Sequence, residues 1–458
     1  MRLPAYAPVT VIGSGMSGCA VAGELARASV PAVVIEAGPN LGRDHVAASP
    51  DSLPLLSASS DPSFLAHAPT RAGAGHYGSR AGLRRRVGGR SLYWRGISLR
   101  IEKPALAAWP ESIRNVLEGA GAAGLYEEVE NTLEAWAGQA LDVARSRREA
   151  ALLERVRCVG FDEAVVTPRA VRVQANGCWS AYTPLLEVPP AWIHPNRTLV
   201  RVDSGPGDKL ELVIRGRSGE ERLRTGTMVL CSGTVENARL ARQILSSCGV
   251  DSPRCYPVAD HLVQGWIVAR SVRYDGDEEG SVLASNHYAS RSNVFIEVSQ
   301  QRDLEFLDVW AMGEQLVSPS AIVRPEETGV VFEIALTAED VEVLVRQREV
   351  LARVAEAMAV EPAAGFADEP VSFRAAVTSS QKQLGVAIPY SCPLGTLDHE
   401  AGTLALGGPV VDEGGRLRGV RQIFAAGPSL FPRCGAANPS LTTLATARYV
   451  ARNVLQQT

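Results

Sequence analysis

The sequence predicts an α/β protein in which a Rossmann-like dinucleotide-binding domain carries an inserted α+β domain, built from an antiparallel sheet and helices. Three observations predict this fold. A strand, a glycine turn, a helix, a second strand and an acidic residue follow one another within residues 9–36. A strand–glycine–helix step recurs at residues 228–240. Strands followed by one long helix occupy the region from about 260 to 394.

The opening segment has the composition of a dinucleotide-binding turn. Gly13 permits a tight turn after the first strand, Gly15 lets the backbone approach a pyrophosphate, and Gly18 lets the helix pack closely on the sheet. The N-terminus of the helix offers unpaired N–H groups to the phosphates. Glu36 follows after about 20 residues, the distance at which a carboxylate binds the ribose hydroxyls. The segment therefore predicts a bound dinucleotide, either a nicotinamide or a flavin.

Bulk composition excludes several classes of function. The chain has 458 residues, of which 46% are hydrophobic and 21% charged, and its net charge of −4 gives no basis for a nucleic-acid partner. The eight cysteines form no C-x-x-C pair, and the seven histidines lack metal-ligand spacing, so we expect reduced thiols and no metal. No signal-peptide pattern and no apolar run of about 18 residues occurs. We therefore expect a cytoplasmic protein without a membrane partner.

A dense motif follows a long irregular stretch at residues 42–82. It spans residues 84–96 and combines a cluster of arginines with the glycine pair Gly88 and Gly89. Paired glycines in a loop allow close backbone approach to a ligand, and the arginines are suited to neutralising a pyrophosphate. Trp94 is expected to serve as a packing anchor that also lies at the site.

The remaining pattern predicts helices and strands in the order that two sheet-based domains require. Ser146 with Glu149 and Thr337 with Asp340 have the spacing of helix N-terminal caps. The predicted elements are helices at 125–136, from 146, from 236, at 337–358 and at 438–455, and strands at 199–202, 210–214, 228–233, 294–298 and 329–334.

These elements predict a discontinuous arrangement of domains. The dinucleotide-binding domain is expected to comprise residues 1–45, 76–258 and 396–458. The substrate-binding domain and its lid are expected to comprise residues 46–75 and 259–395.

Two late segments indicate the family. Residues 399–403 read H-x-x-G-T, residues 429–432 read S-x-F-P, and residues 438–442 read N-P-x-x-T. Together with the opening turn and the double-glycine loop, they resemble the glucose–methanol–choline (GMC) family of FAD-dependent oxidoreductases. The variant segments around Gly427 and Asn438 are most similar to the bacterial sugar-alcohol dehydrogenase and pyranose oxidase branches. Many relatives carry Asp where Gly427 stands, so one familiar cofactor contact is absent.

The resemblance implies a mechanism. It assigns to His399 the role of base for the substrate hydroxyl proton while hydride passes to flavin N5, and to Asn438 the role of holding the substrate oxygen. A helix that begins at Asn438, with Pro439 in its first turn, would direct N–H groups toward the negative end of the reduced flavin. His261 resembles a structural position of the family, and we expect no catalysis there. Tyr93 stands where pyranose oxidases have a histidine attached to FAD, which predicts non-covalent FAD.

The residues expected to bind the cofactor come from all of these motifs. They are Gly13, Gly15, Met16, Ser17, Gly18, Glu36, Ala37, Gly88, Gly89, Ser91, Trp94, Val202, Ser232, Gly233, Gly427, Pro428, Asn438, Pro439 and Thr442.

The expected function is FAD-dependent oxidation of an alcohol, such as a sugar, an aminosugar or a secondary-metabolite hydroxyl, to a carbonyl compound. The expected partners are this small substrate and either oxygen or an electron-accepting protein. The main alternative is a redox-neutral lyase on the same flavin scaffold. A nicotinamide dehydrogenase gives the C-terminal motifs no role, and a non-catalytic flavin-binding protein leaves His399 and Asn438 unexplained.

Overall fold

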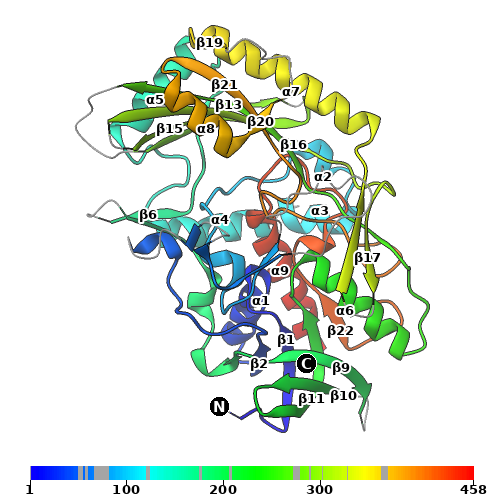
Figure 1. Cartoon of the computed structure of the whole chain (residues 1–458). Helices are drawn as coiled ribbons and strands as arrows, with labels where there is room; N and C mark the ends of the chain where they lie inside the picture. Colours follow the sequence, from blue (N-terminus) through cyan, green and yellow to red (C-terminus); the bar gives the residue numbers. More distant parts are fainter. Residues whose placement is uncertain are drawn as a thin grey trace.

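The computed structural model describes residues 2–49, 55–56, 60–66, 82–119, 124–174, 178–205, 209–271, 279–287, 290–301, 303–326, 329–362 and 370–457. Two bodies lie one above the other (Figure 1), each built around one large sheet. The mixed α/β class predicted from the sequence, with a Rossmann-like domain and an inserted α+β domain, is confirmed. Much of the predicted lid, residues 46–75, falls outside the described residues.

The lower body contains a seven-stranded sheet whose central strands are parallel. Its strand order is β8-β2-β1-β11-β10-β9, and β22 pairs with β11. The predicted meander is the antiparallel part of this sheet, β9 to β11. The strands are β1 (Tyr6–Ile12), β2 (Ala32–Ile35), β8 (Ile193–His194), β9 (Thr198–Ser204), β10 (Leu210–Gly216), β11 (Gly219–Leu230) and β22 (Ile423–Ala425).

Three helices that the sequence motifs predict lie in this body. Helix α1 (Met16–Arg27) packs against α9 (Ser440–Leu455), because the small buried side chains of α1 allow close approach. Helix α6 (Thr234–Ser247) follows the second glycine turn, at Gly233. Helix α9 begins two residues later than predicted, so that Asn438 lies just ahead of its first turn.

The upper body contains an eight-stranded sheet with the order β19-β21-β13-β16-β15-β14-β5, and β20 pairs with β21. Long antiparallel strands form its centre. The strands are β5 (Val165–Val166), β13 (His261–Ser271), β14 (Gly280–His287), β15 (Ser292–Gln301), β16 (Leu304–Glu314), β19 (Glu361–Pro362), β20 (Val371–Ser372) and β21 (Val386–Cys392).

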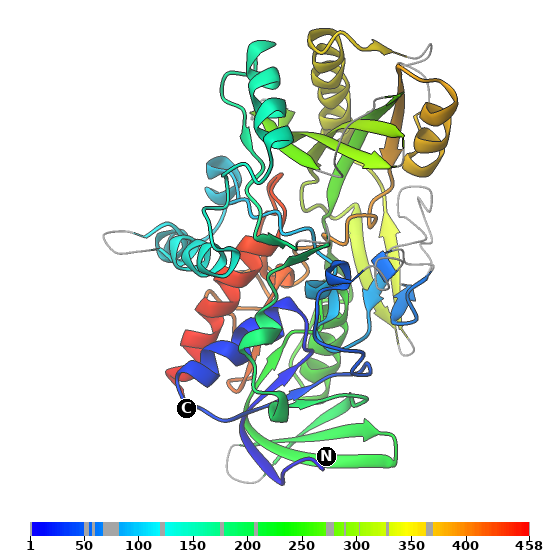
Figure 2. The same cartoon turned by 90° about the vertical axis from the view of Figure 1, so that its left-hand side faces the viewer.

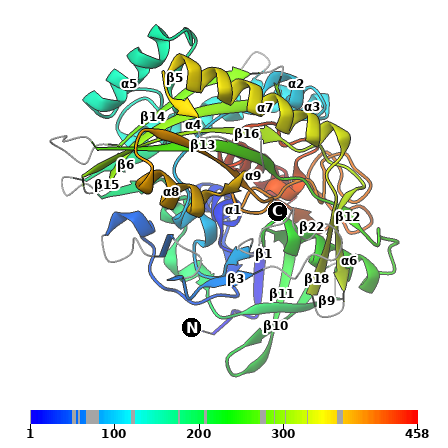
Figure 3. The same ribbon diagram turned by 45° about the horizontal axis from the view of Figure 1, so that its top comes forward.

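Helices cover both faces of this sheet (Figures 2 and 3). Helices α5 (Arg147–Cys158) and α7 (Ala338–Ala357) bury alternate strand residues such as Trp266 on one face. Helix α8 (Phe373–Lys382) packs on the other face, against Ile267 and Tyr390. The predicted caps are present: Ser146 Oγ accepts from the Glu149 amide at 3.0 Å, and Thr337 forms a capping box with Asp340.

Smaller elements complete the described part of the fold. A three-stranded sheet pairs β17 with both β12 and β18 and packs against α6. These elements are β12 (Tyr256–Pro257), β17 (Ala321–Glu326), β18 (Gly329–Ile334), the hairpins β3 (Phe64–Ala66) with β4 (Gly82–Arg84) and β6 (Val171–Val173) with β7 (Trp179–Ala181), and helices α2 (Lys103–Leu106), α3 (Glu111–Glu118) and α4 (Leu125–Ala137). None of the helices in the described part of the chain is long and apolar enough to cross a membrane.

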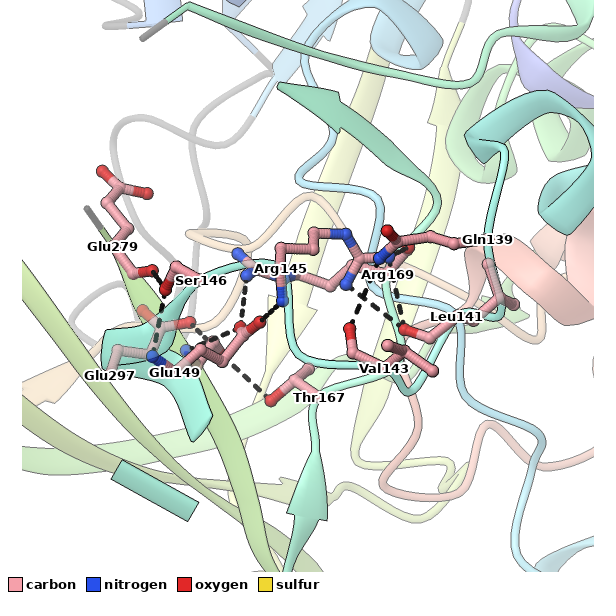
Figure 4. A network of polar contacts seen from close by, with 11 residues as sticks. Gln139, Leu141, Val143, Arg145, Ser146, Glu149, Thr167, Arg169, Glu279 and Glu297 are labelled. Carbon is pink, nitrogen blue, oxygen red and sulfur yellow. Dashed lines mark hydrogen bonds and ion pairs between the residues drawn. The ribbon is translucent and has the colours of Figure 1, made fainter. Parts of the chain in front are cut away.

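A buried carboxylate fixes the segment that links the bodies (Figure 4). Glu149, at the start of α5, is fully buried and accepts hydrogen bonds from Arg169 Nη2 at 2.6 Å and from the Arg145 amide at 2.7 Å. It also accepts from the Ser281 amide of β14 at 3.1 Å. Because these donors come from three segments, Glu149 attaches α5 and the residues just before it to the edge of the upper sheet. Helix α5 and β5 therefore pack with the upper sheet.

Candidate active site

A cavity of about 1180 Å³ is lined by residues of both bodies. The lower body contributes the glycine turn after β1, the double-glycine loop, the segment after β11 and the start of α9. The upper body contributes residues of β15, β16 and β21. The segment that contains His399 also lines it, so the sequence motifs separated by almost the whole chain meet at one cavity.

The glycine turn has the geometry of a phosphate cradle. Gly13 has a φ of 100°, and a side chain at Gly18 would lie 2.0 Å from the Gly13 carbonyl oxygen, so neither position has room for a Cβ. A Cβ on Gly15 would meet no atom within 4 Å and would point into open space. Gly89 of the double-glycine loop lies close to this turn, because a Cβ added to Gly89 would be 3.2 Å from the Cα of Gly15. Two backbone segments free of side chains thus face each other, which fits a bound pyrophosphate.

Glu36 lies at the end of β2 and lines the cavity. Its carboxylate accepts hydrogen bonds from the Ser14 amide at 3.0 Å, from the Ser14 hydroxyl at 2.7 Å and from the Gly38 amide at 2.7 Å. Burial raises the pKa of the Glu36 carboxyl, and these donors oppose that rise. The residue expected to bind a ribose therefore also holds the glycine turn in place.

Most of the predicted cofactor residues line the cavity. They are Gly13, Gly15, Met16, Ser17, Glu36, Ala37, Gly89, Trp94, Ser232, Gly233, Pro428, Asn438 and Pro439. The remaining predicted residues, Gly18, Gly88, Ser91, Val202, Gly427 and Thr442, are not among its lining.

Several of these other residues support the cavity from behind. The Gly88 amide donates to Ser14 Oγ at 3.2 Å, and Ser91 Oγ donates to the Gly88 carbonyl at 2.7 Å. Thr442 Oγ1 is 3.0 Å from the hydroxyl of Tyr126. Val202 lies inside β9, whereas two residues at the start of the same strand, Thr198 and Leu199, line the cavity.

The arginines of the 84–96 motif are bound to other parts of the protein. Arg84 pairs with Asp61 at 3.0 Å, and Arg86 donates to the carbonyl of Leu41 at 2.9 Å. The guanidinium groups of Arg84 and Arg86 thus already have protein partners. These contacts explain the two arginines without the expected role in neutralising a pyrophosphate.

Trp94 and Tyr93 both line the cavity. Trp94 Nε1 donates to the Tyr182 carbonyl at 2.6 Å, so the indole is anchored as well as exposed to the site. The Tyr93 hydroxyl lies 3.3 Å from Ser63 Oγ and accepts from Arg86 at 3.2 Å. Burial raises the pKa of Tyr93, which keeps the phenol protonated.

The His399 segment is held by Arg90 of the double-glycine loop. Arg90 Nη1 donates to the Asp398 carbonyl at 2.9 Å and to Glu400 Oε2 at 2.6 Å. Asp398 has a φ of 60°, a left-handed conformation that is uncommon for residues other than glycine. Local strain of this kind is concentrated at functional sites, and here it directly precedes His399.

His399 contacts a second histidine. Its Nδ1 lies 3.1 Å from Nδ1 of His261, and the two rings are nearly perpendicular, at 84°. Burial lowers the pKa of the His399 imidazole well below its usual value, His261 and Arg90 lower it further, and Glu400 opposes them. His399 is therefore neutral at neutral pH. Sequence reasoning gave His261 only a structural role and did not foresee this contact, because the two residues are 138 positions apart.

Asn438 lines the same cavity, in the loop before α9. Its side-chain oxygen is buried and has no hydrogen-bond partner within the described part of the chain. A buried acceptor without a partner is costly, so a ligand that donates a hydrogen bond to this oxygen would stabilise the site. Together with the side-chain-free cradle, this oxygen indicates that the residues present fit a bound dinucleotide and substrate.

The upper sheet adds polar residues that sequence reasoning missed. Glu297 of β15 and Asp308 of β16 are directly paired across the two strands, and both line the cavity. Arg95 lies 3.3 Å from Glu297, and the Tyr390 hydroxyl donates to Asp308 at 2.8 Å. Burial and the nearby Glu297 raise the pKa of Asp308 to about 7. In the sequence, the feature that could have indicated these two residues is a carboxylate within an otherwise apolar strand.

Comparisons with known proteins agree with this architecture. Residues 324–447 match the family model described as GMC oxidoreductase. The fold is similar to that of pyridoxine 4-oxidase from Mesorbium loti, with a TM-score of 0.65 and 18% identity over 97% of this chain and 98% of that one. It is also similar to formate oxidase from Aspergillus oryzae RIB40, studied for FAD modification, with a TM-score of 0.68 and 13% identity over 100% and 99% of the two chains. No curated protein sequence matches the chain.

Proposed function

We propose that the chain is a member of the GMC oxidoreductases, an FAD-dependent enzyme that oxidises a small polar alcohol to a carbonyl compound. One observation carries the proposal. His399 and Asn438 line the same cavity as Gly13 and Gly15, so a proton acceptor and a neutral polar group adjoin a dinucleotide cradle. That combination is what removal of a proton and a hydride from an alcohol requires.

The glycine turn, the double-glycine loop and the segment around Pro428 and Pro439 would hold FAD. When bound, FAD supplies the acceptor for the hydride that leaves the alcohol carbon. We propose non-covalent binding, because the Tyr93 phenol is protonated and held by Ser63 and Arg86. Acid precipitation should then release free flavin, and flavin that stays with the precipitated chain would overturn this part of the proposal.

His399 is the proposed base. The neutral imidazole is the form that accepts a proton, and burial keeps His399 in that form. Arg90 and Glu400 fix the segment on both sides of the ring, which limits its movement relative to the cavity. General-base catalysis by a positioned histidine accelerates a reaction by about 10²- to 10⁴-fold.

Asn438 is proposed to hold the substrate oxygen. Its carboxamide does not titrate, so it can bind the hydroxyl group without competing with His399 for the proton. The Nδ2 amide group of Asn438 would donate to the substrate oxygen, and its unpartnered side-chain oxygen would accept from a second donor on the ligand, such as another hydroxyl group.

The polar residues of the upper sheet favour a substrate with several hydroxyl groups. Arg95 and Tyr390 offer donors, and Glu297 and Asp308 offer acceptors, to any molecule in this part of the cavity. An alkyl or aryl alcohol would offer these groups no hydrogen bonds beyond those that they make to one another, whereas a polyhydroxylated substrate would. We therefore propose a sugar, an aminosugar or a similar polyhydroxylated compound as the substrate. We propose oxygen as the final acceptor, because the two structures compared above are of oxidases.

Anaerobic mixing of the flavin-loaded protein with a panel of sugars, aminosugars and simple alcohols tests the function. We expect polyhydroxylated compounds to bleach the flavin and simple alcohols to do so much more weakly. Readmitted oxygen should restore the oxidised spectrum. Turnover of a substrate without flavin reduction would instead identify a redox-neutral lyase, and a colourless purified protein would contradict the assigned cofactor.

A further inference from the structure

The hydrogen bonds around His261 determine where its proton lies. His261 Nε2 is 3.0 Å from the carbonyl oxygen of Gly435. A carbonyl oxygen only accepts hydrogen bonds, so Nε2 must be the protonated nitrogen. Burial lowers the pKa of His261 to about 4, so the ring is neutral at neutral pH and its Nδ1 carries no proton. His261 therefore presents a bare acceptor to His399.

The contact between the two rings then fixes the tautomer of His399. Their Nδ1 atoms are 3.1 Å apart, which is hydrogen-bond distance, and one of the two must donate. Because Nδ1 of His261 is the acceptor, Nδ1 of His399 is the donor and carries the proton of the neutral ring. Nε2 of His399 is then the nitrogen with the free lone pair.

We infer that His261 is a positioning residue that holds His399 in the tautomer whose Nε2 can accept the substrate proton. The inference rests on the proposed function for the role of His399, but the tautomer itself follows from the geometry. His261 is buried, with 2% of its surface exposed, and does not line the cavity, whereas His399 does. His261 thus acts through His399 and does not touch the substrate.

The carbonyl that orients His261 is itself held in place. Gly435 has a φ of 65°, and its amide donates to Glu314 Oε1 at 3.1 Å. The next amide, of Ala436, donates to Glu102 Oε2 at 2.9 Å. Two carboxylates thus fix the backbone on both sides of the Gly435 carbonyl. Since Asn438 follows in the same loop, one loop sets both the tautomer of His399 and the position of Asn438.

The other end of His261 is fixed by its own strand. Asp260 Oδ1 accepts from the His261 amide at 2.7 Å, and Asp260 Oδ2 accepts from the Gly395 amide at 2.5 Å. Asp260 therefore ties the start of β13 to the chain that leads into the His399 segment. We call the two hydrogen bonds from Gly435 through His261 to His399 the relay. Glu314 holds the Gly435 end of the relay, and Asp260 holds the backbone of His261.

Two substitutions of His261 distinguish the loss of its hydrogen bond to His399 from the loss of its packing. His261→Asn retains an oxygen near the position of Nδ1 that can accept from His399, whereas His261→Leu retains bulk without an acceptor. In His261→Leu no acceptor holds the proton of His399 on Nδ1. The tautomer of His399 with its proton on Nε2 then becomes populated, and in that tautomer Nε2 cannot accept the substrate proton. We expect flavin reduction to slow by about 10- to 10³-fold in His261→Leu, with flavin content and the substrate concentration for half-maximal rate little changed. His261→Asn should recover much of the rate.

A direct readout does not depend on activity. In protein with ¹⁵N-labelled histidine, the nitrogen shifts of His399, assigned by their loss in His399→Ala, should report a protonated Nδ1 and a bare Nε2. Those of His261 should report the opposite. A protonated Nε2 on His399, or an unchanged rate in His261→Leu, would overturn the inference. If the tautomers are as stated but no alcohol reduces the flavin, the proposed function fails and the relay stands.

Discussion

At the scale of single residues, the site depends on how His399 is held. Asp398 adopts a left-handed conformation, and Arg90 binds both its carbonyl and the carboxylate of Glu400. Such a conformation costs of the order of 1 kcal/mol or more and persists where surrounding contacts stabilise it. Arg90 supplies those contacts from the double-glycine loop. The same arginine therefore links the dinucleotide cradle to the proposed base.

The lowered pKa of His399 predicts the pH dependence of flavin reduction. The neutral ring is the active form, so the rate falls as pH decreases through the folded-state pKa, which burial holds below the usual value. The acid limb of the rate profile should lie below about pH 6.5, the ordinary pKa of histidine. Rapid-mixing measurements of flavin reduction across pH would show it. A midpoint at or above that value would contradict the assignment, and His399→Ala, as a control, should lack this limb.

Sequence reasoning could identify His399 and Asn438 because short motifs contain them. It could not identify Glu297, Asp308 or the importance of His261, because these residues gain their roles only through contacts between distant segments. Val202 illustrates the limit within one strand. Val202 of β9 was expected to bind the cofactor, but only the packed sheet shows that Thr198 and Leu199, at the start of the strand, meet the cavity.

At the scale of elements, the β1–α1 turn was the most predictable part of the fold. The turn needs glycine at position 18 because a Cβ there would collide with the Gly13 carbonyl oxygen. At position 15 a Cβ would meet no protein atom and would instead occupy the open space of the cradle. Helix caps at Ser146 and Thr337 were equally readable, since the cap depends on residues three positions apart. Pairing between strands far apart in the sequence, such as β1 with β11, needed the structure.

Alanine substitutions in this turn should separate folding from cofactor binding. In Gly18→Ala the new methyl group collides with the Gly13 carbonyl, so we expect lower thermal stability together with loss of flavin. In Gly15→Ala the methyl group enters open space on the cradle side, so stability of the flavin-free protein should be preserved while flavin affinity falls. Thermal unfolding of flavin-free protein and flavin titration measure the two effects. Equal destabilisation of both variants would contradict the steric account.

At the scale of the whole molecule, the cavity exists only because two bodies meet. The cradle and the proposed base belong with the lower sheet, and the polar wall of Arg95, Glu297 and Asp308 involves the upper sheet. Glu297 is also 3.3 Å from the Ser281 hydroxyl, within the network around Glu149 (Figure 4). The substrate wall is therefore connected to the contacts that attach α5 to the upper sheet.

Removal of the Glu149 side chain should destabilise this attachment. Glu149→Ala leaves Arg169 without its partner in a buried setting, for which the typical cost is about 3–5 kcal/mol. Glu342→Ala, in an exposed ion pair with Arg346 on α7, should cost less than about 1 kcal/mol. Denaturant unfolding monitored by circular dichroism compares the two variants. A similar cost for both would show that the buried network does not hold the body together.

The most direct test of the account is the rate of anaerobic flavin reduction by a reducing alcohol, measured in the wild type and in His399→Ala. The substitution leaves the cradle residues unchanged, so both proteins should bind flavin with the same spectrum. We expect the reduction rate in His399→Ala to fall by about 10²- to 10⁴-fold. Reduction at the wild-type rate would contradict the central claim that His399 accepts the substrate proton.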